Sequence, residues 1–365
     1  MRVKLEDVCE RGTSSLMQKD IVDKNGKYPV YGASGRIGSM ETYQQEHQTV
    51  AVVKDGAGIG RTMLLPEKSS VIGTMQYLIP KNCIESEYLY YVVKYMHLEK
   101  YFSGATIPHI YFRDYKTEEF NLHDKTEQRE IVSTLKRIEA IISNRQEQLT
   151  KLDELIKARF VEMFGDPKLN PYRFPCNSLS TYITFLTSGS RGWSQYFTDS
   201  GEYFITIKNV KNCKITLQDV QYVAPPDNAE AKRTKVQKND LLISITADLG
   251  RTGVVTEEIA NHGAYINQHL TCIRLKDEQV NPLYVAYYME SDAGKEQFTA
   301  KNQSAVKAGL NFNAINSLKL MAPPLSLQNQ FADFVAEVDK SKVEVQKALD
   351  QTQLLFDSLM QQYFG

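Results

Sequence analysis

Apolar residues recur at alternating steps of four and three positions through two long segments of the chain. This frame starts at Ile131 in the first segment and at Phe331 in the second, and eight of its ten positions are apolar in each. Neither segment contains Gly or Pro before its closing Phe-Gly. Such spacing is typical of helices that pack along a coiled-coil seam. The sequence therefore predicts helices over residues 125–165 and 326–365 that contact each other along one seam. The predicted seam residues are Ile131, Leu135, Ile138, Ile142, Leu149, Leu152, Ile156, Phe331, Val335, Val338, Val345, Leu349, Phe356 and Leu359.

Capping signals mark the expected helix ends. Thr126 and Ser326 stand where N-caps belong, and Gly165, with a proline two residues later, is a stop signal. A helix of about 38 residues is about 57 Å long and cannot bury its seam alone. Its partner is either the other long helix, which the repeated frame favours, or only the globular segment beside it. Two polar seam residues, Arg145 and Arg159, either fix the register of a helix pair or extend to its solvent edge.

The two helical segments belong to a longer internal repeat. At a constant offset of 200, Gln128 falls on Gln328, and Glu162-Met163-Phe164-Gly165 falls on Gln362-Tyr363-Phe364-Gly365. A repeat of this length means that the chain consists of two copies of one unit. Each copy is a globular segment followed by a long helix.

The two globular segments, 1–124 and 166–325, are predicted to mix short strands with helices. Both contain β-branched runs bounded by Gly, Asn and Asp, which are strand signals. Their elements correspond in order, whereas the loops between them differ in length. Two related modules with different loops are therefore expected, in an α+β fold. The matches used for this are Gly60-Arg61-Thr62 with Gly250-Arg251-Thr252, Gln76 with Gln268, and Leu89-Tyr90 with Leu283-Tyr284. The run Asn267, Gln268 and His269 is expected on a strand.

Composition sets limits on the class of protein. The chain of 365 residues has 42% hydrophobic residues, 24% charged residues and a formal net charge of −1. It contains no run of 18 apolar residues, so no membrane span is expected. Five cysteines without a Cys-x-x-Cys pair fit reduced thiols and a cytoplasmic location. Nucleic-acid binding, if present, must rest on local loops and not on bulk basicity.

Motifs for chemistry are missing from the sequence. There is no Gly-x-x-x-x-Gly-Lys-Ser/Thr phosphate loop, and the Gly-rich stretch Asp55–Gly60 is followed by residues that read as a strand instead of a helix. The six histidines form no metal-ligand spacing with one another or with carboxylates. Neither Pro-Pro site fits the Asn/Asp-Pro-Pro-aromatic motif of amino-methyltransferases. We therefore expect no catalytic residue, no metal and no cofactor on this chain.

Several of these features together resemble a known family. They are the helix entries HDKTEQREI and APPLSLQNQF, the Gly-Arg-Thr after an apolar strand, the closing Phe-Gly and the order domain, helix, domain, helix. This combination is similar to the specificity subunit of type I restriction–modification systems, over essentially the full length. The first helix entry departs from the second because it lacks Pro-Pro.

The resemblance implies a function and partners. Segments 1–124 and 166–325 would be target recognition domains, each reading one half of an asymmetric, split site in double-stranded DNA. Segments 125–165 and 326–365 would form an antiparallel rod that sets the gap between the half-sites. Two methyltransferase subunits would dock on this non-catalytic core, and restriction subunits would join it. S-adenosylmethionine, ATP and Mg would bind only to the partner subunits.

Basic and polar residues in Gly- and Ser-rich loops are the candidate DNA contacts. They are Lys24, Lys27, Tyr31, Ser34, Arg36, Arg61, Ser190, Arg191, Trp193, Lys208, Lys211, Lys232, Arg233, Lys235 and Arg251. Other interpretations stay open for some of them. The run from Lys232 to Lys238 also fits a solvated loop, and the single tryptophan, Trp193, also fits a core. Arg61 and Arg251 recur in both copies, which favours a scaffold or phosphate contact over base choice.

Two other classes of protein remain as alternatives. One is a protein-only scaffold built on duplicated coiled-coil modules. The other is a stand-alone DNA modification enzyme, against which the missing methyltransferase motif and phosphate loop both count.

Overall fold

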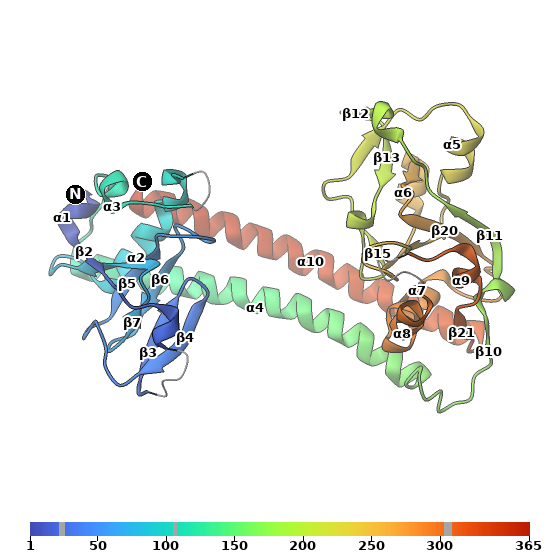
Figure 1. The fold of residues 1–365 in the computed structure, drawn as a ribbon, viewed down its shortest axis with the longest axis horizontal. Helices are drawn as coiled ribbons and strands as arrows, with labels where there is room; N and C mark the ends of the chain where they lie inside the picture. Colours follow the sequence, from blue (N-terminus) through green and yellow to red (C-terminus); the bar gives the residue numbers. More distant parts are fainter. Residues whose placement is uncertain (22–25, 105–107, 303–308) are drawn as a thin grey trace. The chain divides into compact units, whose positions relative to one another are not determined.

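The computed structural model describes residues 1–21, 26–104, 108–302 and 309–365. The chain divides into two compact units, which we call unit 1 (Met1–Gln148 with Val345–Gly365) and unit 2 (Leu149–Glu344). Two 40-residue helices, α4 (Lys125–Phe164) and α10 (Leu325–Phe364), each contribute to both units (Figure 1). Their bounds lie within one residue of the helices expected at 125–165 and 326–365, while the division into four domains stays a prediction.

Unit 1 is built from short strands around one ten-residue helix, and Figure 1 shows both chain ends in this unit. Its strands are β1 (Arg2–Lys4), β2 (Cys9–Thr13), β3 (Tyr28–Gly32), β4 (Gly35–Met40), β5 (Thr49–Val53), β6 (Thr62–Leu65), β7 (Ser70–Val71), β8 (Met75–Pro80) and β9 (Glu119–Asn121). Its α-helices besides α4 and α10 are α1 (Leu5–Val8), α2 (Ser86–Tyr95) and α3 (Phe112–Tyr115), with 3-10 turns η1 (Gln18–Asp20) and η2 (Leu98–Tyr101).

Unit 2 repeats this plan with additional elements. Its strands are β10 (Cys176–Ser178), β11 (Ile183–Ser188), β12 (Phe197–Thr198), β13 (Glu202–Ile205), β14 (Val210–Lys211), β15 (Lys214–Ile215), β16 (Gln221–Val223), β17 (Leu241–Ser244), β18 (Thr252–Val254), β19 (Ala264–Ile266), β20 (Leu270–Leu275) and β21 (Lys319–Met321). Its helices are α5 (Ala229–Thr234), α6 (Glu257–His262), α7 (Pro282–Glu290), α8 (Asp292–Lys301) and α9 (Phe312–Asn316), with 3-10 turns η3 (Leu179–Thr181), η4 (Trp193–Tyr196) and η5 (Ile207–Asn209).

The sheets of the two units have the same topology. Strand order β2-β8-β5-β6 in unit 1 matches β11-β20-β17-β18 in unit 2, and each sheet is antiparallel throughout. In a second sheet, β3 pairs with β7 in parallel just as β13 pairs with β19. The small pair β1-β9 likewise matches β10-β21. The α+β class and the internal repeat predicted from the sequence are therefore confirmed.

The strand registers correct one of the sequence matches. Met75 lies opposite Val53, where Leu270 lies opposite Ser244, so Gln76 corresponds to Thr271 and not to Gln268. Gln268 and its neighbours form the turn between β19 and β20, so the expectation of a strand there was also wrong. A single-residue identity in a short strand carries too little information to fix register, which depends on the cross-strand hydrogen bonds.

The helix pair α2 and α7 is also offset from the sequence match. The Tyr88 hydroxyl donates to the Asn121 carbonyl, and the Tyr284 hydroxyl donates to the Met321 carbonyl, each at 2.8 Å. These bonds make Tyr88, and not Tyr90, the counterpart of Tyr284. Both tyrosines are fully buried, which explains why an aromatic residue recurs at this place.

Each long helix is joined to the start of α2 or α7 by a buried glutamine. Gln128 accepts from the Glu85 amide at 2.8 Å and donates to the Cys83 and His123 carbonyls. Gln328 accepts from the Asn281 amide at 2.8 Å and donates to the Pro323 carbonyl at 2.7 Å. Both glutamines are 0% exposed. The repeated glutamine therefore satisfies backbone groups that would otherwise be buried without partners.

The expected N-caps were each wrong by two residues. Asp124 caps α4, because its carboxylate accepts from the amides of Thr126 and Glu127 at 2.9 Å. In α10 the Pro324 carbonyl accepts from the amides of Leu327 and Gln328, which places Ser326 inside the first turn. Asp is as good an N-cap as Thr, so sequence alone left the choice between neighbouring candidates open.

The end of each long helix completes the core of a unit. In unit 1, Phe364 at the end of α10 packs edge-on against Tyr88, with ring centroids 5.2 Å apart. In unit 2, Phe164 at the end of α4 packs in the same way against Tyr284, at 4.7 Å. Both phenylalanines are 0% exposed. Within each unit the start of one long helix and the end of the other run antiparallel and share one hydrophobic core.

The predicted seam residues divide into buried and half-buried ones. Eight of the fourteen are buried, namely Ile131, Leu135, Ile138, Ile156, Phe331, Val335, Val338 and Phe356. The other six, Ile142, Leu149, Leu152, Val345, Leu349 and Leu359, are half-buried. Phe160 and Met360 are also buried, although the predicted seam contains the preceding residues, Arg159 and Leu359, instead. The buried stripe widens there because a globular segment covers the helix in addition to the other helix.

The polar seam residues behave differently from one another. Arg145 donates to the Ala348 carbonyl and to the Thr352 hydroxyl, the latter at 2.8 Å, so it crosses the seam within unit 1. Arg159 instead pairs with Glu162 on its own helix at 2.9 Å and lies over the Phe334 ring. Arg145 thus fits a role in register, while Arg159 extends to the edge of the pair.

We expect Gln328→Ala to lower the free energy of unfolding of unit 2 by about 1–3 kcal/mol, because it leaves the Asn281 amide and the Pro323 carbonyl buried without partners. The fluorescence of the single tryptophan, Trp193 in unit 2, reports this unfolding in urea. Gln330→Ala, at an exposed glutamine of the same helix within unit 2, is the control. Equal midpoints for the two variants would contradict the role assigned to Gln328.

Candidate nucleic-acid interface

In unit 1, part of the predicted DNA-contacting set gathers at the β3-β4 hairpin. The Arg61 guanidinium donates to the Ala33 carbonyl in the hairpin turn at 2.8 Å, next to exposed Ser34. Tyr31 and exposed Arg36 face each other across the hairpin. Exposed Lys27 lies over the ring of the neighbouring Tyr28. Ser34, Arg36 and Arg61 thus lie at the turn of the hairpin and Lys27 at its other end, while the predicted contact Lys24 lies outside the described residues.

In unit 2, the loop after β11 holds a structural core instead of an exposed reading surface. Ser190 is 2% exposed and its hydroxyl lies 3.0 Å from that of Thr234. Trp193 is 3% exposed, stacks on Phe204 and donates its indole N–H to Glu230 at 3.3 Å. The predictions of Ser190 and Trp193 as DNA contacts are therefore corrected. Only Arg191 of this loop is an exposed cation.

The basic run after it is largely compensated by nearby acids. Lys232 pairs with Asp227 at 3.1 Å, and Lys238 with Glu257 at 2.7 Å. Lys235 pairs with Glu202 at 3.0 Å, and this hydrogen bond raises the pKa of Lys235. The interpretation as a solvated, charge-balanced loop fits better than a phosphate-binding patch, because each lysine already has a counterion.

Arg233 is held by the backbone of its own unit. Its guanidinium donates to the Ser188 carbonyl at 2.6 Å and to the Thr187 hydroxyl. Lys208 and Lys211 differ from this set, since both are exposed on either side of Val210 at the start of the β14-β15 hairpin. They are the predicted cations of unit 2 that stay available, together with Arg191.

The repeated Gly-Arg-Thr forms the same tight turn in both units. Gly60 and Gly250 have φ angles of +81° and +80°, a left-handed conformation that favours glycine. A Cβ on Gly250 would lie 2.3 Å from the Phe298 ring. Their amides donate to the Val53 and Ser244 carbonyls, which closes the loop. The recurrence of this motif is thus explained by the scaffold.

The arginine of this motif also has a structural contact in each unit. Arg61 is bound to the hairpin as described, and half-buried Arg251 pairs with Asp248 in its own loop. Both side chains retain N–H groups at the surface of the loop. Arg61 and Arg251 therefore have a scaffold role, which is one of the alternatives that the sequence left open. A phosphate contact by their remaining N–H groups stays a prediction.

Sequence reasoning missed a group of polar side chains at the loop after β5 and β17. In unit 1 the Asp55 carboxylate lies 2.6 Å from Nδ1 of His109. In unit 2 the Thr246 hydroxyl lies 2.8 Å from Nδ1 of His269, and the Gln268 amide nitrogen lies 3.2 Å from Nε2 of that ring. Asp55 is distant in sequence from His109, as Thr246 is from Gln268 and His269, and these residues share no motif. The one signal in the sequence was the adjacent amide and imidazole side chains of Asn267, Gln268 and His269.

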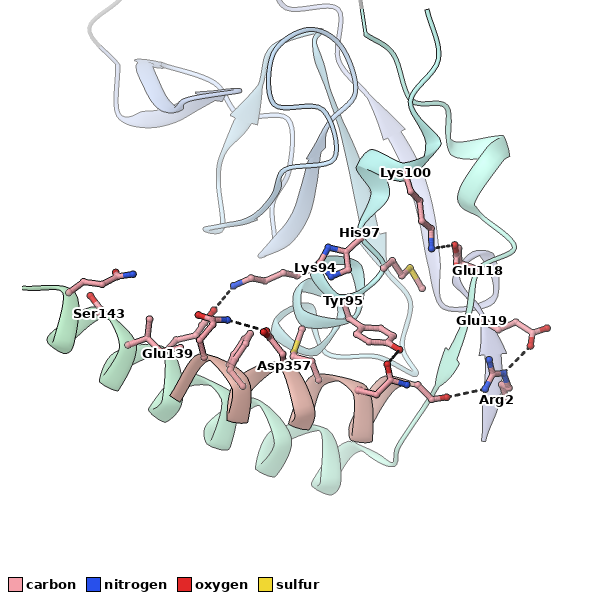
Figure 2. Close-up of a pocket in the computed structure, with 18 residues that line it drawn as sticks. Arg2, Lys94, Tyr95, His97, Lys100, Glu118, Glu119, Glu139, Ser143 and Asp357 are labelled. Atoms are coloured by element: carbon pink, nitrogen blue, oxygen red, sulfur yellow. Dashed lines mark hydrogen bonds and ion pairs between the residues drawn. The ribbon is translucent and has the colours of Figure 1, made fainter. Parts of the chain in front are cut away.

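A cavity of about 1070 Å³ lies in unit 1 beside the two long helices (Figure 2). Buried Phe356 and Met360 of α10 and half-buried Ile142 of α4 form its apolar part. Figure 2 shows that ion pairs surround it, among them Lys94 with Glu139 at 2.6 Å. A further pair, Arg2 with Glu119 at 3.0 Å, closes another side.

A smaller cavity of about 450 Å³ occupies the matching place in unit 2. Its α4 residues Asp153, Lys157, Phe160 and Val161 stand 200 positions before Gln353, Asp357, Met360 and Gln361 of the first cavity. Asn212 and Cys213, from the turn between β14 and β15, line it and reduce its volume. The repeat thus extends to the hollows beside the helices.

The long helices also carry exposed apolar side chains. In unit 1 these are Ile141, Leu354 and Leu355, with 44%, 69% and 51% of their surface exposed. In unit 2 they are Leu155, Val161 and Val343, with 46%, 51% and 64% exposed. Contiguous apolar patches mark protein–protein contacts, so these side chains are candidates for such a contact.

In the described part of the chain, three further features bear on the class of protein: reactive thiols, metal ligands and membrane-spanning helices. Burial raises the pKa of the Cys9 thiol to about 12, and those of Cys213 and Cys272 well above the usual range. Among the described residues there is no group of three His, Cys, Asp or Glu side chains that could hold a metal ion. Within the same ranges, no helix is both long and apolar enough for a membrane crossing.

Comparison with known proteins gives one family and several similar structures. The family described as the type I restriction modification DNA specificity domain matches residues 1–153 and again residues 194–352. The chain is similar to the EcoBI type I restriction enzyme specificity subunit of Escherichia coli, with 21% identity over 170 residues. These are 45% of this chain and 35% of that protein, so the alignment spans about a third of the relative's length.

Two solved structures show the same fold over the whole chain. The S subunit of a type I restriction–modification system from M. genitalium has a TM-score of 0.60 at 16% identity, covering 100% of this chain and 96% of that one. A chain from a structure on complex assembly and conformational transition of the type I R-M system has a TM-score of 0.58 at 15% identity. It covers 100% of this chain and 97% of its own.

The buried position of Trp193 predicts a shielded fluorophore. Acrylamide should quench the native protein only weakly, and the emission should shift to longer wavelength in urea, because the indole leaves an apolar site for water. A parallel titration with free N-acetyltryptophanamide calibrates the quencher. Native quenching as strong as that in urea would place the indole at the surface and restore a stacking role.

Proposed function

Because the chain belongs to the family of type I restriction modification DNA specificity domains, we propose that it is the DNA-specificity subunit of such a system. Each unit reads one half of a split site in double-stranded DNA. The observation that carries the proposal is the double match of the family, on two units whose sheets have the same topology. The loops of the two units differ in sequence, so the site is asymmetric.

The chain itself is non-catalytic in this proposal. The base chemistry and the cofactors, S-adenosylmethionine, ATP and Mg, belong to methyltransferase and restriction subunits in the cytoplasm. The buried thiols and the lack of motifs for chemistry in the sequence support this division of labour. The long helices set the gap between the half-sites, so a longer helix pair gives a wider gap.

Assembly with the methyltransferase uses the exposed apolar side chains of α4 and α10. The family similarity suggests two methyltransferase subunits, and the repeat offers two sets of such side chains with a cavity beside each. The modest number of unpaired cations on the loops supports weak DNA binding by the chain alone. Most phosphate contacts then come from the assembled complex.

Co-expression with its cognate methyltransferase in a methylation-deficient host, followed by single-molecule sequencing of genomic DNA, tests the function. We expect methylation at one asymmetric, split motif, because the two units read different sequences. The host with the methyltransferase alone is the control. The same motif in the control, or no methylation despite a soluble complex, would refute the proposal and favour a protein-only scaffold.

We expect Leu155→Glu combined with Leu355→Glu to weaken methyltransferase binding roughly tenfold or more, because a carboxylate in an apolar contact loses its hydration. Affinity is measured by titration of the purified methyltransferase. Leu169→Glu, at a leucine that is 77% exposed outside the helices, is the matched control. Unchanged affinity of the double variant would exclude these side chains from the contact.

A further inference from the structure

The loops after β5 and β17 follow the same backbone path in the two units. In unit 1 the Ile110 amide donates to the Lys54 carbonyl at 2.9 Å, and in unit 2 the Leu310 amide donates to the Ile245 carbonyl at 2.9 Å. The next residue, Asp55, forms an antiparallel β-bridge with His109, and Thr246 forms the same bridge with Gly309. The turns at Gly60 and Gly250 close both loops. In each unit, the loop after β5 or β17 is therefore crossed by a second segment, residues 109–110 or 309–310, and we call this place the loop crossing.

The side chains at this shared crossing differ completely. Asp55 and Thr246 occupy the same backbone position, two residues beyond the strand carbonyl that closes the loop. Each holds Nδ1 of an imidazole, but the ring comes from His109 in unit 1 and from His269, in the β19-β20 turn, in unit 2. A fixed backbone with exchanged polar side chains is the arrangement that lets one scaffold read two different sequences.

Gln268 stands out among the polar groups at the crossing in unit 2. Its amide nitrogen lies 3.2 Å from Nε2 of His269, and His269 is in turn held by Thr246. This contact limits the rotation of the Gln268 side chain. The residue is half-buried. An amide that is oriented in this way presents a donor and an acceptor side by side, the pattern that pairs with adenine N6 and N7 in the major groove.

A cation lies next to Gln268. The backbone amide of Gln268 donates to the Ser190 carbonyl at 2.9 Å, and the backbone amide of Ser190 donates to the Ile266 carbonyl at 2.9 Å. These two bonds place exposed Arg191 directly beside the β19-β20 turn. In unit 1, Lys54 pairs with Asp55 at 3.4 Å, so exposed Arg61, at the end of the corresponding loop, is the cation there without an acidic partner among the described residues. Cations beside polar side chains combine the phosphate contact and the base contact that recognition requires.

We propose that this loop crossing is the base-reading site of each unit, with Gln268 as a specificity-determining residue in unit 2 and Asp55 in its counterpart. The inference rests on the function proposed above. A carboxylate held by an imidazole accepts a hydrogen bond, as from cytosine N4, whereas an amide both donates and accepts. The two units therefore present different polar groups at the same loop crossing, from the loop after β5 in unit 1 and from the β19-β20 turn in unit 2.

The test uses the complete complex and the sequencing assay of genomic methylation. Gln268→Ala is expected to relax one base position in one half-site by roughly tenfold or more, with the other half-site and the gap unchanged. Gln268→Glu keeps the size of the side chain and is expected to shift the preference at the same position. Asp55→Asn is expected to alter the opposite half-site. Gln279→Ala, at an exposed glutamine of unit 2, is the control.

Each result decides the inference. An unchanged motif with both Gln268 variants overturns it while leaving the specificity function intact. Loss of all methylation with both variants also overturns it, since it assigns Gln268 to folding; thermal unfolding of the purified chains identifies that case. The absence of a split motif with the unaltered protein refutes the proposed function itself and not the assignment of Gln268.

Discussion

Insertion of a helix end into a globular core is the constraint on which the rest of this structure depends. Phe364 packs under Tyr88 in unit 1, and Phe164 packs under Tyr284 in unit 2. Burial of a phenylalanine side chain stabilises the folded state by about 1.5–3 kcal/mol, so each core depends on the far end of a long helix. The helix in turn buries its seam only where a second helix and a core meet it. Globular segment and helix are therefore mutually dependent.

The buried glutamines hold the other end of each helix by a different kind of interaction. Gln128 and Gln328 pair with backbone groups at the start of α2 and α7, where an apolar residue would leave an amide and a carbonyl unsatisfied. One end of a helix is thus fixed by hydrogen bonds and the other by aromatic packing. This combination explains why Gln and the closing Phe-Gly recur at the same offset, while the surface residues between them do not.

The scaffold leaves the loops free to differ. The crossing of the loop after β5 or β17 is held by backbone bonds and by glycine at a left-handed turn, none of which depends on the side chains beside it. Asp55 and Thr246 can therefore exchange without a change of fold. In contrast, the lysines of the run 232–238 pair with Asp227, Glu202 and Glu257, so this basic stretch of unit 2 carries its own counterions.

The sequence by itself determined the two long helices, the α+β class, the repeat and the family. The reason is that a seven-residue apolar period and a constant offset depend only on the order of residues along the chain. It could not determine strand register, since Gln76 and Gln268 agree in type but differ in hydrogen-bond position. It also could not separate Trp193 in a core from Trp193 on a surface, or paired lysines from free ones, because burial and counterions come from segments distant in the chain. Tertiary structure alone brought Asp55 to His109, and the adjacent Gln268 and His269 to Thr246 and Arg191, because only the strand pairing places these loops side by side.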